Sequence, residues 1–339
     1  MKSIISITCP KCKGKLYKYG KTPDGYQKYQ CKSCKHQFAP DKTNTYKDPK
    51  YPKCPLCHKA SFLHHDYEFY SNYRCGDKKC YHSFFETKPT AIPDATMSQL
   101  FGKNDFKRMR YPTHIILNVI AMFNLGNTSF RKIAFLMKLM HNVKLSHTTV
   151  ANWCHNFAPF WHNISLELIP GLNFNSDEWH AEETVVKIKG VKHWIWFIID
   201  SETRFVLGYH LSPHRDSTAA FTALNSVDKL GKPYSLVSDR LPAYTQPVKT
   251  VLGVTHIQVQ DFTDDISNNL IECFNKQFKA WYKAKNGFSS FNHANNLIST
   301  FVFFFNFVRP HMALNGLTPA QVAGLKLDAK QSKKYRFVA

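Results

Sequence analysis

Three acidic residues in the C-terminal half of the chain lie near the ends of expected secondary-structure elements. Glu182 stands at the head of the β-branched run "EETVVKIKG", Asp239 follows the apolar run of "VSDR", and Glu272 lies within "ISNNLIECFNKQFKAWYKAKNG", a long helix expected to end at Gly287. Carboxylates from separate elements can converge at one edge of a sheet and hold two Mg2+ ions, because hard cations demand oxygen ligands. Two such ions, roughly 4 Å apart, stabilise the attacking and leaving oxygens of a phosphodiester displacement. Taken singly, each acid is ordinary, since Asp239 could pair with Arg240 and Glu272 could be solvated.

A stripe of lysines follows Glu272 along the same expected helix. Lys276, Lys279 and Lys283 lie four, seven and eleven positions after Glu272, which places all four residues on one face. This pattern suits a metal ion at one end of the helix and DNA phosphates beyond it. The alternative is charge pairing along a helix, which contributes only about 0.2–0.5 kcal/mol per pair.

Eight of the ten cysteines lie before residue 81 and form two similar sets. The first set is Cys9, Cys12, Cys31 and Cys34, and the second is Cys54, Cys57, Cys75 and Cys80. Paired C-x2-C turns have the spacing of a four-cysteine zinc site, and the second set differs only in its closing C-x4-C. A disulfide framework is the alternative, but a lysine-rich chain expected inside the cell argues against it. We therefore predict two zinc ribbons, over residues 1–45 and 46–88, each with one structural Zn2+.

The next region predicts a basic linker, residues 89–112, and a helix-turn-helix domain, residues 113–165. One helix is expected to end at Gly126, the next, "TSFRKIAFLMKLMHN", to begin at its Thr/Ser cap, and the last to begin at Ser146 and extend through Trp161. The polar face of this last helix carries Thr148, Asn152 and His155. Asn can read adenine and Thr can contact the thymine methyl group, so we expect this face to bind DNA. A generic helical bundle is the alternative.

From Glu178 the hydrophobic period changes to that of strands, and the expected element order is βββαβαβα. This order predicts an α/β domain, residues 174–310, with a mixed five-stranded sheet and helices. Its most apolar segment, Leu297 to Val308, is 12 residues long. Because a membrane span needs about 20 residues, we expect a buried helix there and no membrane association. Residues 311–339 are expected to form a C-terminal tail.

The chain of 339 residues carries 45 Lys and Arg against 24 Asp and Glu, a net charge of +21. A charge of this size indicates a polyanionic partner, most often nucleic acid, with an anionic membrane surface as the competing interpretation. The first ten residues lack the features of a signal peptide. The expected location is therefore cytoplasmic and associated with the nucleoid.

From about residue 88 to 324 the chain resembles the DDE transposases of prokaryotic insertion sequences, of the insertion-sequence-six type and its archaeal relatives. The stretches that carry the resemblance are "EETVVKIKG", "FIIDSETRFVLGYHLSPHRDS", "VSDRLPAY", "DDISNNLIECFNKQFKAWYKAKNGF" and "NFVRPHMALNGLTPA". The resemblance implies an RNase H-like catalytic core and strand cleavage and transfer at element ends with two Mg2+ or Mn2+ ions. Its implied partners are double-stranded DNA, at element ends and target, and further copies of the chain in a homodimer or higher oligomer. It assigns the metal-binding roles to Asp239 and Glu272, and a basic role to Lys279.

Position 182 departs from the pattern of the resembled family. The family has Asp-Glu-Thr where this chain has Glu182-Glu183-Thr184, so a Glu replaces the first metal ligand and Glu183 is expected on the opposite face. The extra methylene adds roughly 1.5 Å of reach, and metal geometry is sensitive to shifts of about 1 Å. Three functions follow: a transposase that is active or only weakened, an inactive or co-opted DNA-binding protein, and, disfavoured by "SPHRDS" and "RPH", another RNase H-like nuclease or integrase.

Overall fold

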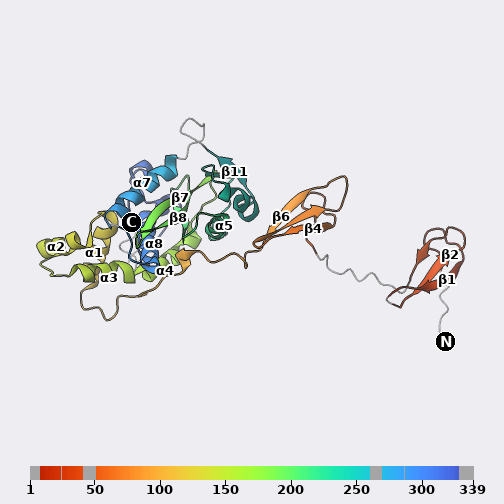
Figure 1. Ribbon diagram of the computed structural model, residues 1–339, viewed down its shortest axis with the longest axis horizontal. Coiled ribbons are helices and arrows are strands. Elements are labelled where there is room, and N and C mark those ends of the chain that lie inside the picture. The colour runs from red at the N-terminus through yellow and green to blue at the C-terminus, as the bar shows by residue number, and fades with distance from the viewer. Residues whose placement is uncertain (1–7, 24, 41–50, 260–268, 286, 328–339) are drawn as a thin grey trace. The chain divides into compact units, whose positions relative to one another are not determined.

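The computed structural model describes residues 8–23, 25–40, 51–259, 269–285 and 287–327. The chain divides by its internal contacts into two units. The first consists of residues 1–63 and 73–84, and the second of residues 64–72 and 85–339. The first unit contains the cysteine sets, and the second contains the helices and the large sheet (Figure 1).

Each cysteine set is built on a three-stranded sheet whose strands follow one another in chain order. The first sheet consists of β1 (Leu16–Lys21), β2 (Gln27–Cys31) and β3 (Gln37–Phe38), and the second of β4 (Ser61–Asp66), β5 (Tyr70–Cys75) and β6 (Ser83–Thr87). Neither sheet is large enough to bury much apolar surface. We therefore expect a metal ion bound by the four cysteines to stabilise each sheet.

Four helices precede the large sheet: α1 (Thr113–Leu125), α2 (Phe130–His141), α3 (His147–Asn156) and α4 (Ala158–Leu168). The side chains of Ser129 and Ser146 cap α2 and α3 by accepting a backbone N–H, as the sequence indicates. The expectation of one helix from Ser146 through Trp161 is wrong. The helix breaks at Phe157, and Pro159 starts a new one, because proline is favoured only in the first turn of a helix.

The large sheet has the strand order β11-β10-β7-β8-β9. The strands are β7 (Glu178–Ile188), β8 (Val191–Asp200), β9 (Val206–Ser212), β10 (Ser235–Ser238) and β11 (Thr255–Gln258). β7, β8 and β9 pair antiparallel, whereas β10 pairs parallel with both β7 and β11. The prediction of a mixed five-stranded sheet is confirmed, and the fold is RNase H-like.

Helices cover both faces of this sheet. They are α5 (Ser217–Asn225), the short α6 (Thr245–Pro247), α7 (Asn269–Lys283) and α8 (Phe291–Phe307). On β8, Phe197 packs against Phe278 of α7, whereas its neighbour Trp196 packs against Tyr244 from the other side. Since Glu182 pairs with Phe197 and Glu183 with Trp196, the two adjacent acids point to opposite faces of the sheet.

The expected linker, helical domain and tail pack directly on this sheet and its helices. Asn295 of α8 donates to the carbonyl of Thr96 at 2.6 Å, and Thr96 lies in the short 3-10 helix η1 (Thr96–Ser98). Phe123 of α1 contacts Trp281 of α7. At the C-terminal side, α9 (Pro319–Val322) buries Ala320. Within the described residues, the boundaries expected at 112 and 165 therefore separate no independent cores.

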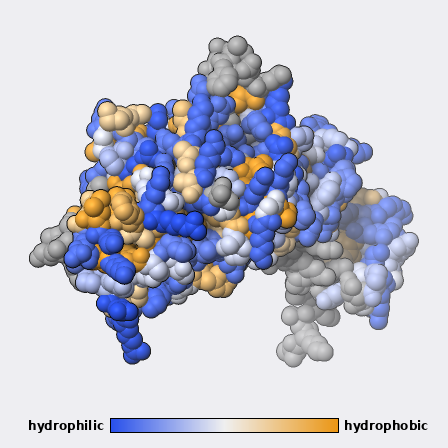
Figure 2. Space-filling view, turned by 60° about the vertical axis from the view of Figure 1, so that its left-hand side comes forward, coloured by the Kyte–Doolittle hydropathy of each residue, from blue (hydrophilic) through white to orange (hydrophobic). Residues whose placement is uncertain are grey.

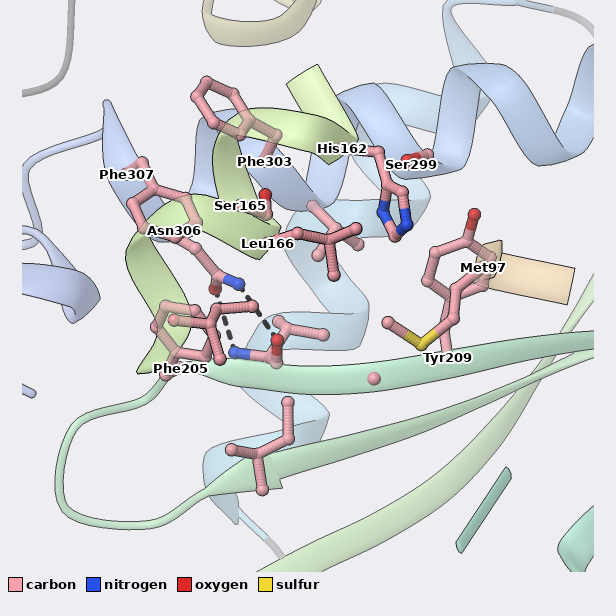
Figure 3. Close-up of a pocket in the computed structure, with 15 residues that line it drawn as sticks. Met97, His162, Ser165, Leu166, Phe205, Tyr209, Ser299, Phe303, Asn306 and Phe307 are labelled. Carbon is pink, nitrogen blue, oxygen red and sulfur yellow. Dashed lines mark hydrogen bonds between the residues drawn. The ribbon is translucent and has the colours of Figure 1, made fainter. Parts of the chain in front are cut away.

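No single helix among the described residues is long and apolar enough to cross a membrane, although α8 with the segment Met312–Val322 passes as a bent pair by length and composition. A small cavity of about 50 Å³ lies between α4, α8 and β9 (Figure 3). Asn306 bonds both backbone groups of Val206 there, each at 2.9 Å. Ligand pockets are several-fold larger, so this cavity is a packing gap and not a substrate site.

Candidate metal centre and nucleic-acid interface

Glu182 points from β7 toward α7 and lines an open groove of about 500 Å³. Its carboxylate atom Oε2 is buried and has no hydrogen-bond partner among the described residues. Burial, followed by repulsion from Glu272, raises the pKa of the Glu182 carboxyl to about 7. A cation in the groove would relieve both effects, because it neutralises the charge that burial disfavours.

The groove contains the whole predicted stripe of α7. Its lining residues are Glu182, Glu272, Asn275, Lys276, Lys279, Ala280 and Lys283. Two of the three predicted carboxylates and all three predicted lysines therefore share one surface. Lys276 and Lys283 are exposed, whereas the Lys279 ammonium donates to the carbonyl of Val185 at 2.6 Å. Burial lowers the pKa of Lys279. Through its bond to the Val185 carbonyl, this lysine also fixes α7 against β7.

The third carboxylate, Asp239, lies beside an arginine. Arg215 pairs with the buried Glu183, donating from Nε at 2.7 Å, and its Nη2 lies 3.7 Å from Asp239 Oδ2. Tyr244 donates its hydroxyl to the other oxygen of Glu183 at 3.1 Å. Burial, and then the Glu183 charge, raise the pKa of Tyr244 well above its ordinary value. Arg215 thus connects the buried acid on one sheet face with the acid at the strand end.

The donor set fits a hard divalent cation, because it consists of carboxylate oxygens at the end of a sheet. Asp239 follows β10, which pairs in parallel with the part of β7 that precedes Glu182. However, among the described residues only the two cysteine sets place all their ligand atoms within 4.8 Å of one another. The structure therefore brings Glu182 and Glu272 into one groove, whereas Asp239 does not line that groove and acts on Glu182 only through its charge.

The expected DNA-binding face of α3 needs one correction. Thr148 and Asn152 are exposed, whereas His155 is 4% exposed and stacks on His293. Neither ring nitrogen of His155 has a partner among the described residues, and burial lowers its pKa to about 2. His155 therefore cannot contact DNA. It lies where α3 packs on α8, a position that its helical spacing from Asn152 did not reveal.

Each cysteine set brings four sulfur atoms together in a geometry that could hold one metal ion. The sulfur pairs Cys12–Cys31 and Cys57–Cys75 lie 3.4 Å apart, close to the separation of about 3.8 Å that four thiolates at 2.3 Å from one zinc would have. In each set the four sulfur atoms lie within 4.8 Å of one another. Backbone N–H groups, first that of Cys34, help to lower the pKa of Cys31 to about 6.

The turns that present these sulfurs share one backbone feature. The residue after the second cysteine of every pair has a positive φ, namely Lys13 (57°), Lys35 (58°), His58 (56°) and Tyr81 (47°). Such a conformation is uncommon for side chains larger than glycine. It directs backbone N–H groups back toward the preceding residues, as in the bond from Lys13 to the Cys9 carbonyl at 2.8 Å. The repeat predicted from the cysteine spacing is thus also a repeat of turn geometry.

Sequence reasoning did not identify three residues of the site as functional: Arg215, Tyr244 and Asn275. Arg215 lies in "SPHRDS" and Tyr244 in "LPAY", stretches that are apolar or turn-like and carry no metal-ligand spacing. Asn275 lies one turn after Glu272 on α7. Its position three residues after Glu272, on the same helical face, is the one sequence signal that could have indicated that Asn275 belongs to the site.

Two protein families match parts of the chain. Residues 176–311 match the family described as "DDE domain", and residues 1–35 match the "InsA N-terminal domain". The "Transposase for insertion sequence-like element IS431mec" of Staphylococcus aureus is 24% identical over 197 residues, which cover 58% of this chain and 84% of that protein. The transposase for insertion sequence element IS257 in transposon Tn4003, also from S. aureus, has the same identity and coverage.

Among solved structures, the HTLV-2 integrase catalytic core domain in complex with magnesium is 20% identical, with a TM-score of 0.35, covering 45% of this chain and 99% of that chain. The BIV integrase catalytic core domain is 18% identical, with a TM-score of 0.35, covering 47% of this chain and 98% of that chain. These TM-scores are too low to carry an argument. The strand order and the "DDE domain" match carry the fold assignment instead.

Proposed function

We propose that this chain, in which residues 176–311 match the family described as "DDE domain", cleaves DNA at the ends of an insertion sequence and transfers them to target DNA. The observation that carries the proposal is the groove in which Glu182 and Glu272 lie beside the lysine stripe of α7. Acidic metal ligands and phosphate-binding lysines lie side by side mainly on the surfaces of enzymes that act on nucleic acids.

In this proposal Glu182, Asp239 and Glu272 hold Mg2+ or Mn2+, and the bound ions supply electrostatic stabilisation of the attacking and leaving oxygens. Lys276 and Lys283, both exposed on the groove, bind DNA phosphates and fix the strand relative to the carboxylates. Lys279 holds α7 against β7 through the Val185 carbonyl. It thereby keeps Glu272 and Glu182 in register across the groove.

Element ends are recognised, in this proposal, by the exposed face of α3. Thr148 and Asn152 lie there, one helical turn apart and open to solvent. Figure 2, in which the side carrying α1 to α3 comes forward, shows a largely hydrophilic surface interrupted by apolar patches. The net charge of +21 adds sequence-independent attraction to DNA, since phosphate contacts supply most of the affinity. Copies of the chain would act together as a dimer or larger assembly.

Because Glu182 stands where the resembled family has Asp, we also propose that strand cleavage by this chain is weakened. A carboxylate one methylene longer than Asp reaches roughly 1.5 Å further from β7, so a metal bound by Glu182 is displaced or its side chain is bent. The second candidate function is a transposase-derived DNA-binding protein without catalysis. It is favoured by the Arg215–Asp239 contact at 3.7 Å, because a guanidinium beside a metal ligand competes with the metal.

The test uses the zinc-loaded full-length protein and labelled duplexes carrying the terminal repeats that flank its coding sequence. Strand cleavage is measured with Mg2+, with Mn2+ and without metal, for the wild type and for Asp239→Asn. The proposal expects cleavage at the repeat ends that depends on metal and is lost in Asp239→Asn. Specific binding of the repeats without any cleavage would instead establish the DNA-binding function, and cleavage that persists in Asp239→Asn would contradict the assigned site.

A further inference from the structure

Asn275 lines the same groove as the two predicted acidic ligands Glu182 and Glu272. It is not itself one of the predicted metal ligands. It lies on α7 one turn after Glu272, its side chain is 8% exposed, and it lines the groove with Glu182 and Glu272. Neither Nδ2 nor Oδ1 of Asn275 has a hydrogen-bond partner among the described residues. The Oε2 atom of Glu182 is buried and unpaired in the same way.

An unpaired carboxamide in a buried position lowers folding stability, because it loses water without gaining a protein partner. Such groups are rare in folded proteins and need a specific explanation at each position. Here the amide lies near a carboxylate that also lacks a partner. The amide and the carboxylate line the same groove, and neither the Asn275 amide nor Glu182 Oε2 is paired among the described residues.

We propose, building on the transposase function proposed above, that Asn275 is a positioning residue whose Nδ2 donates to the Glu182 carboxylate when that carboxylate holds a cation. Carboxylates that bind metals are commonly oriented by hydrogen bonds from neighbouring groups, and losing such a group weakens metal affinity or activity about 10- to 100-fold. Glu182 has one more rotatable bond than the Asp of the resembled family, so it needs more restraint to hold a ligand geometry. Asn275 supplies that restraint from the facing helix and offsets part of the cost of the longer side chain.

The experiment measures Mn2+ binding to the zinc-loaded full-length protein by calorimetry, so its readout does not depend on cleavage. Asn275→Ala is expected to raise the dissociation constant about 10- to 100-fold, and Asn275→Leu, which keeps the volume, is expected to do the same. The matched control is Gln277→Ala. Gln277 lies on the same helix and its Oε1 is also buried and unpaired, but it lines a separate cavity with Ile199 and Phe305. Its loss is expected to leave Mn2+ binding unchanged.

A double-mutant cycle separates positioning from general structural support. In a Glu182→Asp background the side chain is roughly 1.5 Å shorter and ends further from α7, so Asn275→Ala is expected to change Mn2+ affinity less than twofold. The melting temperature of metal-free Asn275→Ala is expected to stay level or rise, because an unpaired buried amide has been removed. A lower melting temperature, with equal losses of affinity in both backgrounds, would overturn the positioning role.

Two further outcomes distinguish this inference from the function on which it rests. If the wild type binds Mn2+ and Glu272→Gln abolishes that binding, but Asn275→Ala binds as tightly as the wild type, the role of Asn275 is wrong and the proposed function stands. If the wild type shows no Mn2+ binding that depends on Glu272, the proposed function fails and this inference fails with it.

Discussion

At the scale of single residues, the adjacent acids Glu182 and Glu183 perform different tasks because a strand directs them to opposite faces. Glu183 is buried and paired with Arg215 and Tyr244, so it is already neutralised and satisfied. Glu182 faces Glu272 across an open groove without a partner for Oε2. The acid available for a cation is therefore Glu182, whose side chain is longer than the family pattern expects.

Glu182→Asp is expected to raise the rate of strand cleavage in Mg2+ by 10- to 1,000-fold, about 1.4 to 4 kcal/mol of barrier. The physical reason is that the shorter side chain restores the distance between β7 and a metal held with Asp239 and Glu272. The measurement is cleavage of labelled terminal-repeat DNA by the wild type and the variant, with repeat binding as the control that should not change. An active wild type that loses activity in the Asp variant would show that the site has adapted to Glu.

Arg215→Ala is expected to lower the free energy of unfolding by about 1–3 kcal/mol, because Glu183 would keep only the Tyr244 hydroxyl as a partner. The cost stays below that of orphaning a fully buried charge, since the Arg215 side chain is 44% exposed and water can replace part of the contact. Calorimetric melting at neutral pH measures the change. Arg240→Ala, an exposed neighbour of Asp239, is the control and should change stability by less than about 0.5 kcal/mol.

At the scale of elements, we expect each three-stranded cysteine sheet to depend on a bound zinc ion, whereas the larger elements depend on packing. The ribbons hold their sulfurs through four turns that contain positive-φ residues, and without a ligand the thiolates would repel one another. In contrast, α7 buries Ile271, Phe274, Phe278 and Trp281 against the sheet and α8. Such apolar burial contributes roughly 1.5–3 kcal/mol for each large side chain and needs no ion.

Metal analysis of the purified chain is expected to give two zinc ions per chain, because each sulfur set can hold one tetrahedral ion. Cys31→Ser should reduce the content to one, since three thiolates remain in that set and structural zinc needs four ligands. Cys273→Ser is the matched control, because Cys273 is exposed on α7 and belongs to neither set. An unchanged zinc content in Cys31→Ser would contradict the assigned ligands.

The junction of α1 and α7 contains a buried lysine whose stability contribution depends on pH. Lys285 Nζ lies 4.2 Å from the Phe123 ring and 4.1 Å from the Trp281 ring, and burial lowers its pKa to about 6. Between that value and its ordinary pKa of about 10.4, the unfolded chain binds a proton that the folded chain does not. Folding stability from this group therefore rises with pH across the window and is lowest at or below pH 6.

Lys285→Met is accordingly expected to raise the melting temperature most near pH 6, with a gain that shrinks as the pH approaches 10. Melting curves of both proteins across this range test the sign. Lys283→Met, which changes an exposed lysine at the end of α7, two residues before Lys285, should show no such trend. A gain for Lys285→Met that is constant with pH would mean that the lysine is protonated in the folded protein.

At the scale of the whole molecule, the net charge of +21 is expected to make the affinity for DNA strongly dependent on salt. Each phosphate neutralised by a lysine releases counterions, so the slope of log affinity against log salt reports the number of such contacts. The exposed lysines of the α7 groove and the exposed polar residues of α3 would contribute differently to this slope. Lysines bind phosphates of any sequence, whereas Asn reads a base edge.

Affinity for terminal-repeat DNA is expected to fall by about 10³-fold or more between 50 and 200 mM salt. Lys283→Ala should reduce the magnitude of the salt slope by about one and weaken binding to all sequences alike. Asn152→Ala should leave the slope unchanged and reduce the preference for the repeat over unrelated DNA. Titrations of both DNAs at four salt concentrations separate the two effects. A salt-independent affinity would contradict the proposed electrostatic contribution.

The sequence by itself determined the features that depend on spacing along the chain. The two sulfur sets, the helix caps at Ser129 and Ser146, the order of strands and helices along the chain and the stripe after Glu272 follow from local periodicity and turn chemistry, and the structure contains them. Tertiary structure alone decided which side chains meet across elements. Arg215 reaches Glu183 and Asp239 from the loop before α5, Asn275 faces Glu182 from α7, and α8 covers His155.

Helical spacing places His155 on the face of Asn152, but a periodicity does not say which part of a face a distant helix will cover. These contacts join residues between 24 and 141 positions apart in the chain, so they depend on how the elements pack, and packing is decided by the whole core rather than by any one stretch of sequence.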